Sequence, residues 1–175
     1  KTENHIYKIL VTLPIRIEDS CDIINFIHEI DENKKKLSFQ WRIKPHPSIN
    51  PNDIKDKVLI QSKDFILVSG SFYDRIKNCH LLLGNASSTI LEALSFGIPT
   101  IIAANRNGIT DNPIPKNVPK DVWDICYTAN EFIDAFYRLV INKDKELSAS
   151  QKKLSENIKS KYFEPIDKNL INKLI

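Results

Sequence analysis

The segment from His80 to Ala103, HLLLGNASSTILEALSFGIPTIIA, combines residue types and spacing that could do chemistry. The consecutive hydroxyl residues Ser87–Thr89 open a predicted helix just after an apolar strand that ends in Gly-Asn. The first turn of a helix leaves backbone N–H groups unpaired and carries the positive end of the helix dipole, so it favours anions. Glu92 follows one turn later, where a carboxylate can accept hydrogen bonds from sugar hydroxyls. The arrangement suits a nucleotide monophosphate or diphosphate with its ribose.

The same residues also have purely structural interpretations. Ser87 is suited to cap the helix, and Glu92 to be a solvated carboxylate. Three consecutive hydroxyls exceed what one cap needs, and Glu92 stands among apolar neighbours and points back toward the helix start. We therefore expect Ser87, Ser88 and Thr89 to bind an anion and Glu92 to bind a ribose. Gly97 and Pro99 are expected to be structural, as a helix stop and a strand start.

Apolar strands alternate with amphipathic helices along the chain. Strands are expected at Tyr7–Leu13, Ser38–Lys44, Val58–Ile60, Phe65–Val68, Leu81–Leu83, Thr100–Ala103 and Asp124–Tyr127. Helices are expected after a cap at Asp19 or Ser20, over Phe72–Cys79, from Ser87, over Glu131–Asn142 and over about Leu147–Tyr162. This alternation predicts an α/β fold, a Rossmann-like parallel sheet flanked by helices.

Polar clusters follow three of the expected strands. They are Lys44-Pro45-His46-Pro47, Ser69-Gly70-Ser71 and Asn85–Thr89. Ligands of open parallel sheets bind beyond the carboxyl ends of the strands, so we expect these clusters to meet in one cleft. The candidate binding residues are Lys44, His46, Ser69, Ser71, Asn85, Ser87, Ser88, Thr89 and Glu92.

The four histidines differ in their setting. His46 lies between two prolines at a strand end, which favours a functional role beside a bound phosphate. His5, His28 and His80 fit structural roles, and no histidine has the spacing of metal ligands, so no metal site is expected. The sequence also contains no P-loop, dinucleotide fingerprint or Ser-His-Asp constellation.

The composition is that of an ordinary globular domain. The 175 residues are 42% hydrophobic and 27% charged, with a net charge of only +3, which disfavours a nucleic-acid partner. Cys21, Cys79 and Cys126 are odd in number, far apart and set among apolar residues, which is typical of reduced core cysteines in the cytosol. No apolar stretch approaches the roughly 20 residues of a membrane span.

Two motifs together resemble a known family. IKPHP followed downstream by GNASSTILEALSFGIPTI resembles the carboxyl-terminal, donor-binding domain of glycosyltransferases with the two-domain glycosyltransferase-B architecture. The resemblance covers roughly Tyr7 to Val140. A His-Pro pair with a downstream Ser-Ser pair looks more narrowly like bacterial surface-polysaccharide enzymes, namely capsule polysialyl- and Kdo-transferases and the glycerophosphotransferases of teichoic-acid synthesis.

The resemblance implies roles for individual residues. In those enzymes the histidine and the serine pair contact the phosphate of a cytidine nucleotide, which implies that role for His46, Ser87 and Ser88. The segment with Glu92 and Ala93, ending in Gly97 and Pro99, is similar to their ribose-binding element. The implied function is a glycosyltransferase that uses a CMP-linked or other nucleotide-linked sugar donor. His46 would stabilise the leaving phosphate electrostatically.

Two other functions stay open. One is a nucleotide-sugar 2-epimerase or hydrolase of the same architecture, and the other is a stand-alone nucleotide-binding module. An epimerase predicts extra carboxylates and histidines near the phosphate-binding rim, of which the sequence shows few.

Residues 1–175 are expected to form a single domain of a longer chain, because the sequence lacks an initiator Met and begins close to a strand. The missing acceptor domain would supply the general base, so the isolated fragment is expected to be inactive. The expected partners are the nucleotide-sugar donor and a glycan or lipid-linked acceptor, with no nucleic acid and no cofactor. Membrane association is expected only through other parts of the chain, and the expected location is the cytoplasm.

Overall fold

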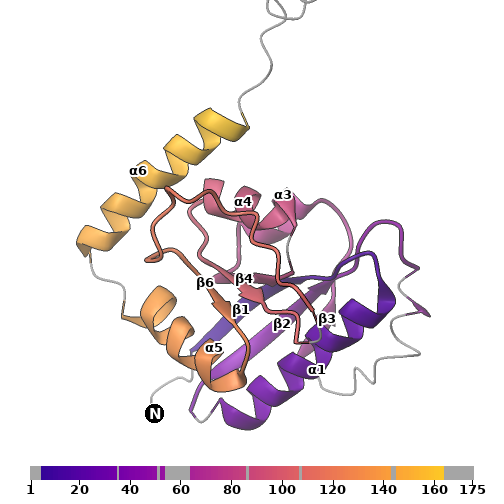
Figure 1. Ribbon diagram of the computed structural model, residues 1–175. Helices are drawn as coiled ribbons and strands as arrows, with labels where there is room; N and C mark the ends of the chain where they lie inside the picture. The colour runs from indigo at the N-terminus through magenta and orange to yellow at the C-terminus, as the bar shows by residue number, and fades with distance from the viewer. Residues whose placement is uncertain are drawn as a thin grey trace, which may run out of the picture.

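The computed structural model describes residues 5–34, 36–50, 52–53, 64–85, 87–106, 108–142 and 145–163. Within these residues, six strands form one sheet in the spatial order β3-β2-β1-β4-β5-β6, and every neighbouring pair is parallel (Figure 1). The strands are β1 Ile6–Thr12, β2 Ser38–Lys44, β3 Phe65–Leu67, β4 Leu81–Gly84, β5 Thr100–Ala103 and β6 Trp123–Cys126. This is the doubly wound order of Rossmann-like sheets.

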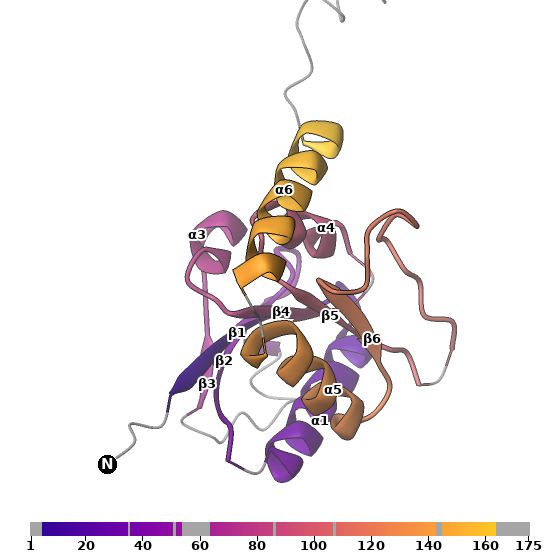
Figure 2. The same cartoon turned by 90° about the vertical axis from the view of Figure 1, so that its left-hand side faces the viewer.

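Helices cover both faces of the sheet (Figure 2). One face carries α1 (Ile17–Asn33) and α5 (Ala129–Phe136), which continues into a π-helical turn over Tyr137–Ile141. The other face carries α3 (Phe72–Ile76), α4 (Ser88–Ser95) and α6 (Lys145–Tyr162). The expected three-layer α/β architecture is confirmed.

Side-chain patterning explains which strands lie at the centre. In β1, consecutive residues Ile9, Leu10 and Val11 are all fully buried, because helices cover both sides of this strand. In β2, only every second residue is buried, and Trp41 packs its ring 6.0 Å from that of Phe132 in α5. The strict alternation of β2 therefore reflects a strand buried mainly against the α1 and α5 layer.

β1 and β4 are parallel neighbours at the centre of the sheet. From β1 the next strands in sequence, β2 and β3, are added on one side, whereas β4, β5 and β6 are added on the other side. Thr12 of β1 stands opposite Gly84 of β4 at their carboxyl ends. A Cβ atom on Gly84 would lie 2.6 Å from Thr12 Oγ1, so only glycine lets the two strand ends approach this closely. Such a switch point opens a crevice at the carboxyl ends of the strands.

Most expected elements are found, with shifted ends. The strands at Tyr7–Leu13, Phe39–Lys44, Phe65–Val68, Leu81–Leu83 and Thr100–Ala103 share the sheet as predicted, and the strand expected at Asp124–Tyr127 begins at Trp123. The expected strand Val58–Ile60 lies outside the described residues. The helix expected over Phe72–Cys79 ends at Ile76, and the one expected at Glu131 begins at Ala129 after a Thr128 cap.

The predicted cap of α1 is wrong. The helix begins at Ile17 after Arg16, which makes no side-chain cap, and not after Asp19 or Ser20. Ser20 lies inside the first turn, where its hydroxyl donates to the carbonyl of Pro14 (3.1 Å). That bond ties the helix start to the loop that leaves β1.

Candidate functional site

A cavity of about 310 Å³ opens at the switch point, beyond the carboxyl ends of β1, β2 and β4. We call it the switch-point cavity. The residues that line it are Thr12, Leu13, Pro14, Ile15, Lys44, Pro45, His46, Pro47, Phe72, Asn85, Ser87 and Thr89. Five of the nine candidate residues therefore meet here, as the strand ends predicted.

The start of α4 forms one wall of this cavity through a chain of hydroxyls. Ser87 is the N-cap, and its Oγ accepts hydrogen bonds from the backbone N–H of Thr89 (3.4 Å) and from Thr89 Oγ1 (3.2 Å). Thr89 Oγ1 also lies 3.4 Å from Thr12 Oγ1, across the close contact of β1 and β4. The capping interpretation of Ser87 is thus confirmed, and the same wall presents donors and a helix N-terminus to the cavity.

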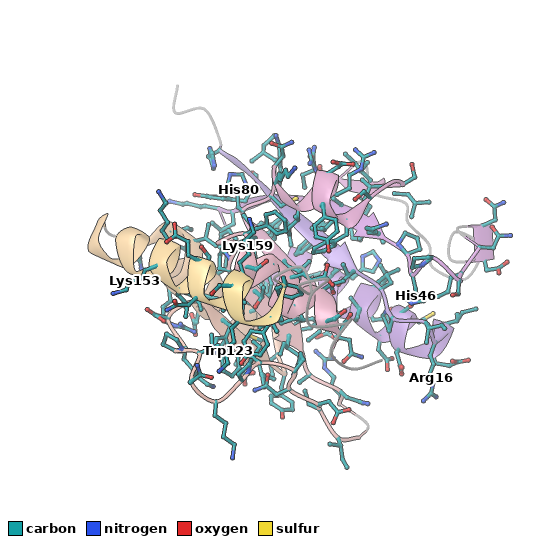
Figure 3. The ribbon with its side chains drawn as sticks, turned by 90° about the horizontal axis from the view of Figure 1, so that it is seen from above. Arg16, His46, His80, Trp123, Lys153 and Lys159 are labelled. Atoms are coloured by element: carbon teal, nitrogen blue, oxygen red, sulfur yellow. The ribbon has the colours of Figure 1, made fainter. Side chains whose placement is uncertain are left out.

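The end of β2 forms the opposite wall. The backbone N–H of Ser48 donates to Nδ1 of His46 (3.2 Å), so in the neutral ring the proton sits on Nε2, where it can be donated to a ligand. Lys44 donates from Nζ to the carbonyl of Gly70 (2.8 Å), whose φ of +91° favours glycine. His46 lies beside the start of α1 near Arg16, at one end of the molecule (Figure 3). Lys44 is the one charged side chain in the lining, so the cavity favours an anion over a cation.

Two candidate serines lie beside this cavity and not in it. Ser69 lines an adjoining open hollow that shares Lys44, Pro45, His46 and Pro47 with the switch-point cavity. Ser71 is the N-cap of α3, and its hydroxyl accepts the backbone N–H of Tyr73 (3.2 Å). The turn over Ser69–Ser71 therefore borders the site and is anchored to it through Lys44.

Ser88 and Glu92 lie together on another side of α4. Ser88 Oγ donates to Glu92 Oε1 (3.2 Å), and neither residue lines the switch-point cavity. The negative charge of Glu92, followed by the hydrogen bond to it, raises the pKa of Tyr73 in α3. The rings of Tyr73 and Phe96 lie 5.6 Å apart, and Phe96 follows Glu92 by one helical turn, so Glu92 is on the α3 side of α4, next to the turn that carries Ser69 and Ser71.

A second cavity of about 250 Å³ adjoins the first, and sequence reasoning missed it. We call it the α1 cavity. It is lined by Asp19, Asp22, Ile23, Asn25, Phe26, Glu29, Asn85, Ala103, Ala104, Asn105, Arg106, Cys126 and Tyr127. The polar residues of α1 at positions 19, 22 and 29 recur at helical spacing and form the signal that was overlooked, because only the apolar stripe of that helix was considered.

A clamp closes the outer side of the α1 cavity. Arg106 holds both carboxylate oxygens of Glu29, with each N–O distance 2.6 Å, and donates from Nε to the carbonyl of Tyr127. Its guanidinium carbon also lies 5.3 Å from the centre of the Phe26 ring. The hydrogen bond from Arg106 lowers the pKa of Glu29. Deeper in the cavity, burial raises the pKa of the Cys126 thiol to about 12, so this wall is neutral at physiological pH.

No group of three or more histidine, cysteine, aspartate or glutamate side chains among the described residues is arranged to hold a metal ion. None of the helices in that part of the chain has the length and apolarity needed to cross a membrane.

The sequence matches no protein-family model and no curated protein at a significant level. Solved structures do match in fold. The S. aureus MnaA–UDP co-structure has a TM-score of 0.58 and 18% identity over 87% of this chain and 40% of its own. Spinosyn rhamnosyltransferase SpnG has a TM-score of 0.58 and 11% identity, over 89% of this chain and 42% of its own. The N. meningitidis UDP-GlcNAc 2-epimerase bound to UDP-GlcNAc has a TM-score of 0.51 and 21% identity, over 89% of this chain and 40% of its own.

The 175-residue chain thus spans about two fifths of the length of these three proteins. The neighbours include both glycosyltransferases and 2-epimerases, which share one fold, so the similarity does not separate the two activities. The sheet order, the helices on both faces and these matches agree with one another. The chain has the Rossmann-like α/β fold of one domain of the glycosyltransferase-B architecture.

Proposed function

We propose that the chain is the nucleotide-sugar-binding domain of a glycosyltransferase that acts in bacterial surface-polysaccharide synthesis. The observation that carries the proposal is the switch-point cavity, which collects Lys44, His46, Ser87 and Thr89 around the N-terminus of α4. Lys44 carries a positive charge, and the His46 ring and the two hydroxyls can donate hydrogen bonds. That set fits a phosphate or diphosphate.

Lys44, with its positive charge, and His46, with its ring N–H at Nε2, form the side of the proposed phosphate site that lies opposite the helix N-terminus. Charge that develops on the leaving nucleotide would be stabilised there by donors that are already in place, which lowers the barrier to transfer. Nδ1 of His46 is engaged by the backbone of Ser48, which orients the ring and leaves Nε2 for the ligand. We assign His46 to leaving-group stabilisation, with Asn85, Ser87 and Thr89 beside it.

Glu92 is the proposed ribose ligand. Its carboxylate is held by the hydroxyl of Ser88 and faces Tyr73, so it is fixed on the α3 side of the helix start. A nucleoside placed here would extend over the turn of Ser69 and Ser71. Ser88 then acts by orienting Glu92, not by contacting the phosphate.

One feature of the lining favours transfer over 2-epimerisation or hydrolysis of the nucleotide sugar. The switch-point cavity offers Lys44, His46 and hydroxyl donors but no carboxylate, a set that suits stabilisation of a leaving phosphate. Proton transfer at the sugar ring would instead have to use the carboxylates of the α1 cavity, of which Glu29 is already held by Arg106. In a transferase, the acceptor domain can supply the base. We propose that a separate domain holds the glycan or lipid-linked acceptor, and that catalysis needs no cofactor besides the donor.

We also propose a cytoplasmic location. Cys21, Cys79 and Cys126 are all free thiols, two of them buried, as is usual in reducing compartments. Nucleotide-activated sugars would meet the domain there.

Thermal unfolding of the 175-residue chain with CMP, CDP, UDP or GDP tests the proposal. A nucleotide at about 100 times its Kd adds about 2.7 kcal/mol of stability, which should raise Tm by several degrees. The variant Lys44→Gln/His46→Gln should lose most of this increase, because it removes the charge of Lys44 and the ring N–H of His46 that would contact the phosphate. Lys77→Gln, which removes an exposed cation outside the cavity, should keep it. If no nucleotide raises Tm, the proposal is wrong.

A further inference from the structure

The α1 cavity and the switch-point cavity lie side by side along the carboxyl edge of the sheet. Asn85, at the end of β4, belongs to both linings. From there the switch-point cavity extends toward β1 and β2, whereas the α1 cavity extends toward β5 and β6, whose ends contribute Ala103 and Cys126. A molecule bound in one cavity can therefore reach into the other past a single side chain.

The position of Glu92 gives a bound donor its direction. Phe96, one helical turn after Glu92, has its ring 5.6 Å from that of Tyr73 in α3, the helix that connects β3 to β4. Glu92 is therefore on the α3 side of α4, and a ribose on it lies away from β5 and β6. In a nucleotide sugar, the ribose and the transferred group are attached to opposite ends of the phosphate group. With the phosphates at the start of α4, the transferred group points toward the α1 cavity.

The walls of the α1 cavity suit a polyol. Its inner part is apolar and includes Ile23, Phe26 and Ala103, on which the C–H face of a sugar can pack. Its rim carries carboxylates and the amides of Asn25 and Asn105, which can bond to hydroxyl groups. The volume of about 250 Å³ accommodates one monosaccharide unit.

The two cavities differ in charge. The one charged side chain in the lining of the switch-point cavity is the cation Lys44, whereas the α1 cavity is lined by three carboxylates and one guanidinium. That guanidinium, Arg106, is held at 2.6 Å by Glu29 and also interacts with the charge of Asp22, so it offsets only one of the three carboxylates and the lining keeps a net negative charge. Asp19 has only a long, exposed contact of 3.8 Å with Arg16, which lies outside the lining.

We infer that the α1 cavity receives the transferred group and selects an uncharged or amino-bearing glycosyl or polyol unit over an acidic one. The inference rests on the proposed function. It also separates this chain from the enzymes that its His-Pro and Ser-Ser motifs resemble where those transfer acidic groups such as sialic acid or Kdo. A carboxylate on the donor would lie beside Asp22 and be repelled.

Isothermal titration with UDP, UDP-glucose and UDP-glucuronic acid tests this. The two nucleotide sugars differ only at C6, which is a hydroxymethyl group in one and a carboxylate in the other, so the effect of Asp22→Asn and of salt on the ratio of their Kd values measures the contribution of charge. At low ionic strength we expect UDP-glucose to bind about fivefold more tightly than UDP-glucuronic acid, the effect of like charges about 4 Å apart in a watery site. If GDP is the preferred nucleotide, GDP-mannose and GDP-mannuronic acid replace this pair.

The variant Asp22→Asn should bring the two Kd values within about twofold, because it removes the carboxylate and keeps the shape. Asp19→Asn should change the ratio in the same direction. Glu32→Gln, which removes an exposed carboxylate of α1 outside the lining, should leave the ratio unchanged. Half-molar NaCl should weaken the discrimination in the unaltered chain.

The possible results separate the inference from the function beneath it. If no nucleotide or nucleotide sugar binds, the proposed function fails and the inference fails with it. If UDP binds, but UDP-glucose and UDP-glucuronic acid have equal Kd values, the function stands and the inference is wrong. A ratio that responds equally to Asp22→Asn and Glu32→Gln also overturns it, since the selectivity would then reflect only the net charge of the helix.

Discussion

His46 lies at the carboxyl ends of the parallel strands and His80 at their amino ends, and the surroundings of the two residues differ. Both accept a backbone N–H at Nδ1, from Ser48 at 3.2 Å and from Lys8 at 2.9 Å. The ring of His80 packs edge-on against those of His5 and Tyr7, at 5.4 and 5.6 Å, on the amino side of the sheet. The ring of His46 instead lines a cavity. Figure 3 shows the two residues well apart.

The difference shows that a backbone hydrogen bond to a histidine does not identify its role. At the amino edge, neighbouring rings occupy the space around His80, so this residue helps to join β1 to the start of β4. At the carboxyl edge, Pro45 and Pro47 hold the chain open around His46, and its neighbours are a lysine and hydroxyls. We therefore expect substitutions at the amino edge to affect stability alone and those at the carboxyl edge to affect ligand binding as well.

Gly84→Ala should have the largest effect at the carboxyl edge. The new methyl group would lie 2.6 Å from Thr12 Oγ1, so the ends of β1 and β4 must separate. We expect a loss of about 1–3 kcal/mol in the free energy of unfolding, measured by urea denaturation, and weaker nucleotide binding. Adding Thr12→Ala removes the clashing oxygen and should recover part of the stability. Full stability of the single variant would contradict the close approach of the two strands.

Ser87→Ala and Ser88→Ala should separate capping from ligand orientation. Ser87 caps α4 and lines the cavity, so its loss should cost about 1 kcal/mol of stability and about 1–3 kcal/mol of nucleotide binding. The hydroxyl of Ser88 bonds to Glu92, so Ser88→Ala should leave the free energy of unfolding unchanged and weaken the binding of nucleosides and of nucleotides to the same extent. If Ser87→Ala lowers Tm but leaves the Kd for the nucleotide unchanged, Ser87 acts only as the cap of α4.

The amino edge should carry a pH dependence of stability. Burial, followed by the nearby charge of His5 and the charges of Lys8 and Arg42, lowers the pKa of His80 below its ordinary value of 6.5, so the folded state binds this proton less readily than the unfolded state. The free energy of unfolding should therefore fall as the pH drops below about 6.5 toward the lower folded-state pKa. His80→Asn keeps an acceptor for the Lys8 N–H and should flatten this profile. An unaltered slope in urea titrations of that variant would rule out His80 as its source.

The smallest effect should come from the clamp at the α1 cavity. The side chains of Glu29 and Arg106 are 42% and 44% exposed, so their pairing should contribute less than about 1 kcal/mol to stability. A double-mutant cycle with Glu29→Gln and Arg106→Gln measures the coupling between them. A coupling well above that value would mean that the clamp fixes the carboxyl edge and does not merely border it.

Local patterns in the sequence were enough to predict the sheet. The alternation of Phe39, Trp41 and Ile43 predicted a strand that is buried on one face, which is what β2 shows. The Ser-Ser-Thr run predicted the start of α4, and Ser87 is its cap. The carboxyl-edge position of His46 also followed from strand order alone, because parallel strands end on the same side.

The remaining features depend on contacts between distant residues. Ser20 was expected to cap α1 but bonds to the carbonyl of Pro14, which only the path of the preceding loop determines. Ile114 and Val118 fix the loop after β5 against the core, although prolines and asparagines surround them in the sequence. The α1 cavity depends on Arg106 reaching Glu29 across 77 positions, which no local pattern encodes. Whether the candidate residues bind a ligand stays a prediction.

NMR spectroscopy of the chain with the nucleotide that raises its Tm most would test the central claim directly. The ring signals of His46 and His80 can be followed in one titration, together with the amide signals of Ser87 and Thr89. We predict that the His46, Ser87 and Thr89 signals shift in saturable fashion with a common Kd, while the His80 ring stays unchanged. Saturable shifts at His80 with none at His46 would contradict the assignment of the nucleotide site to the carboxyl edge of the sheet.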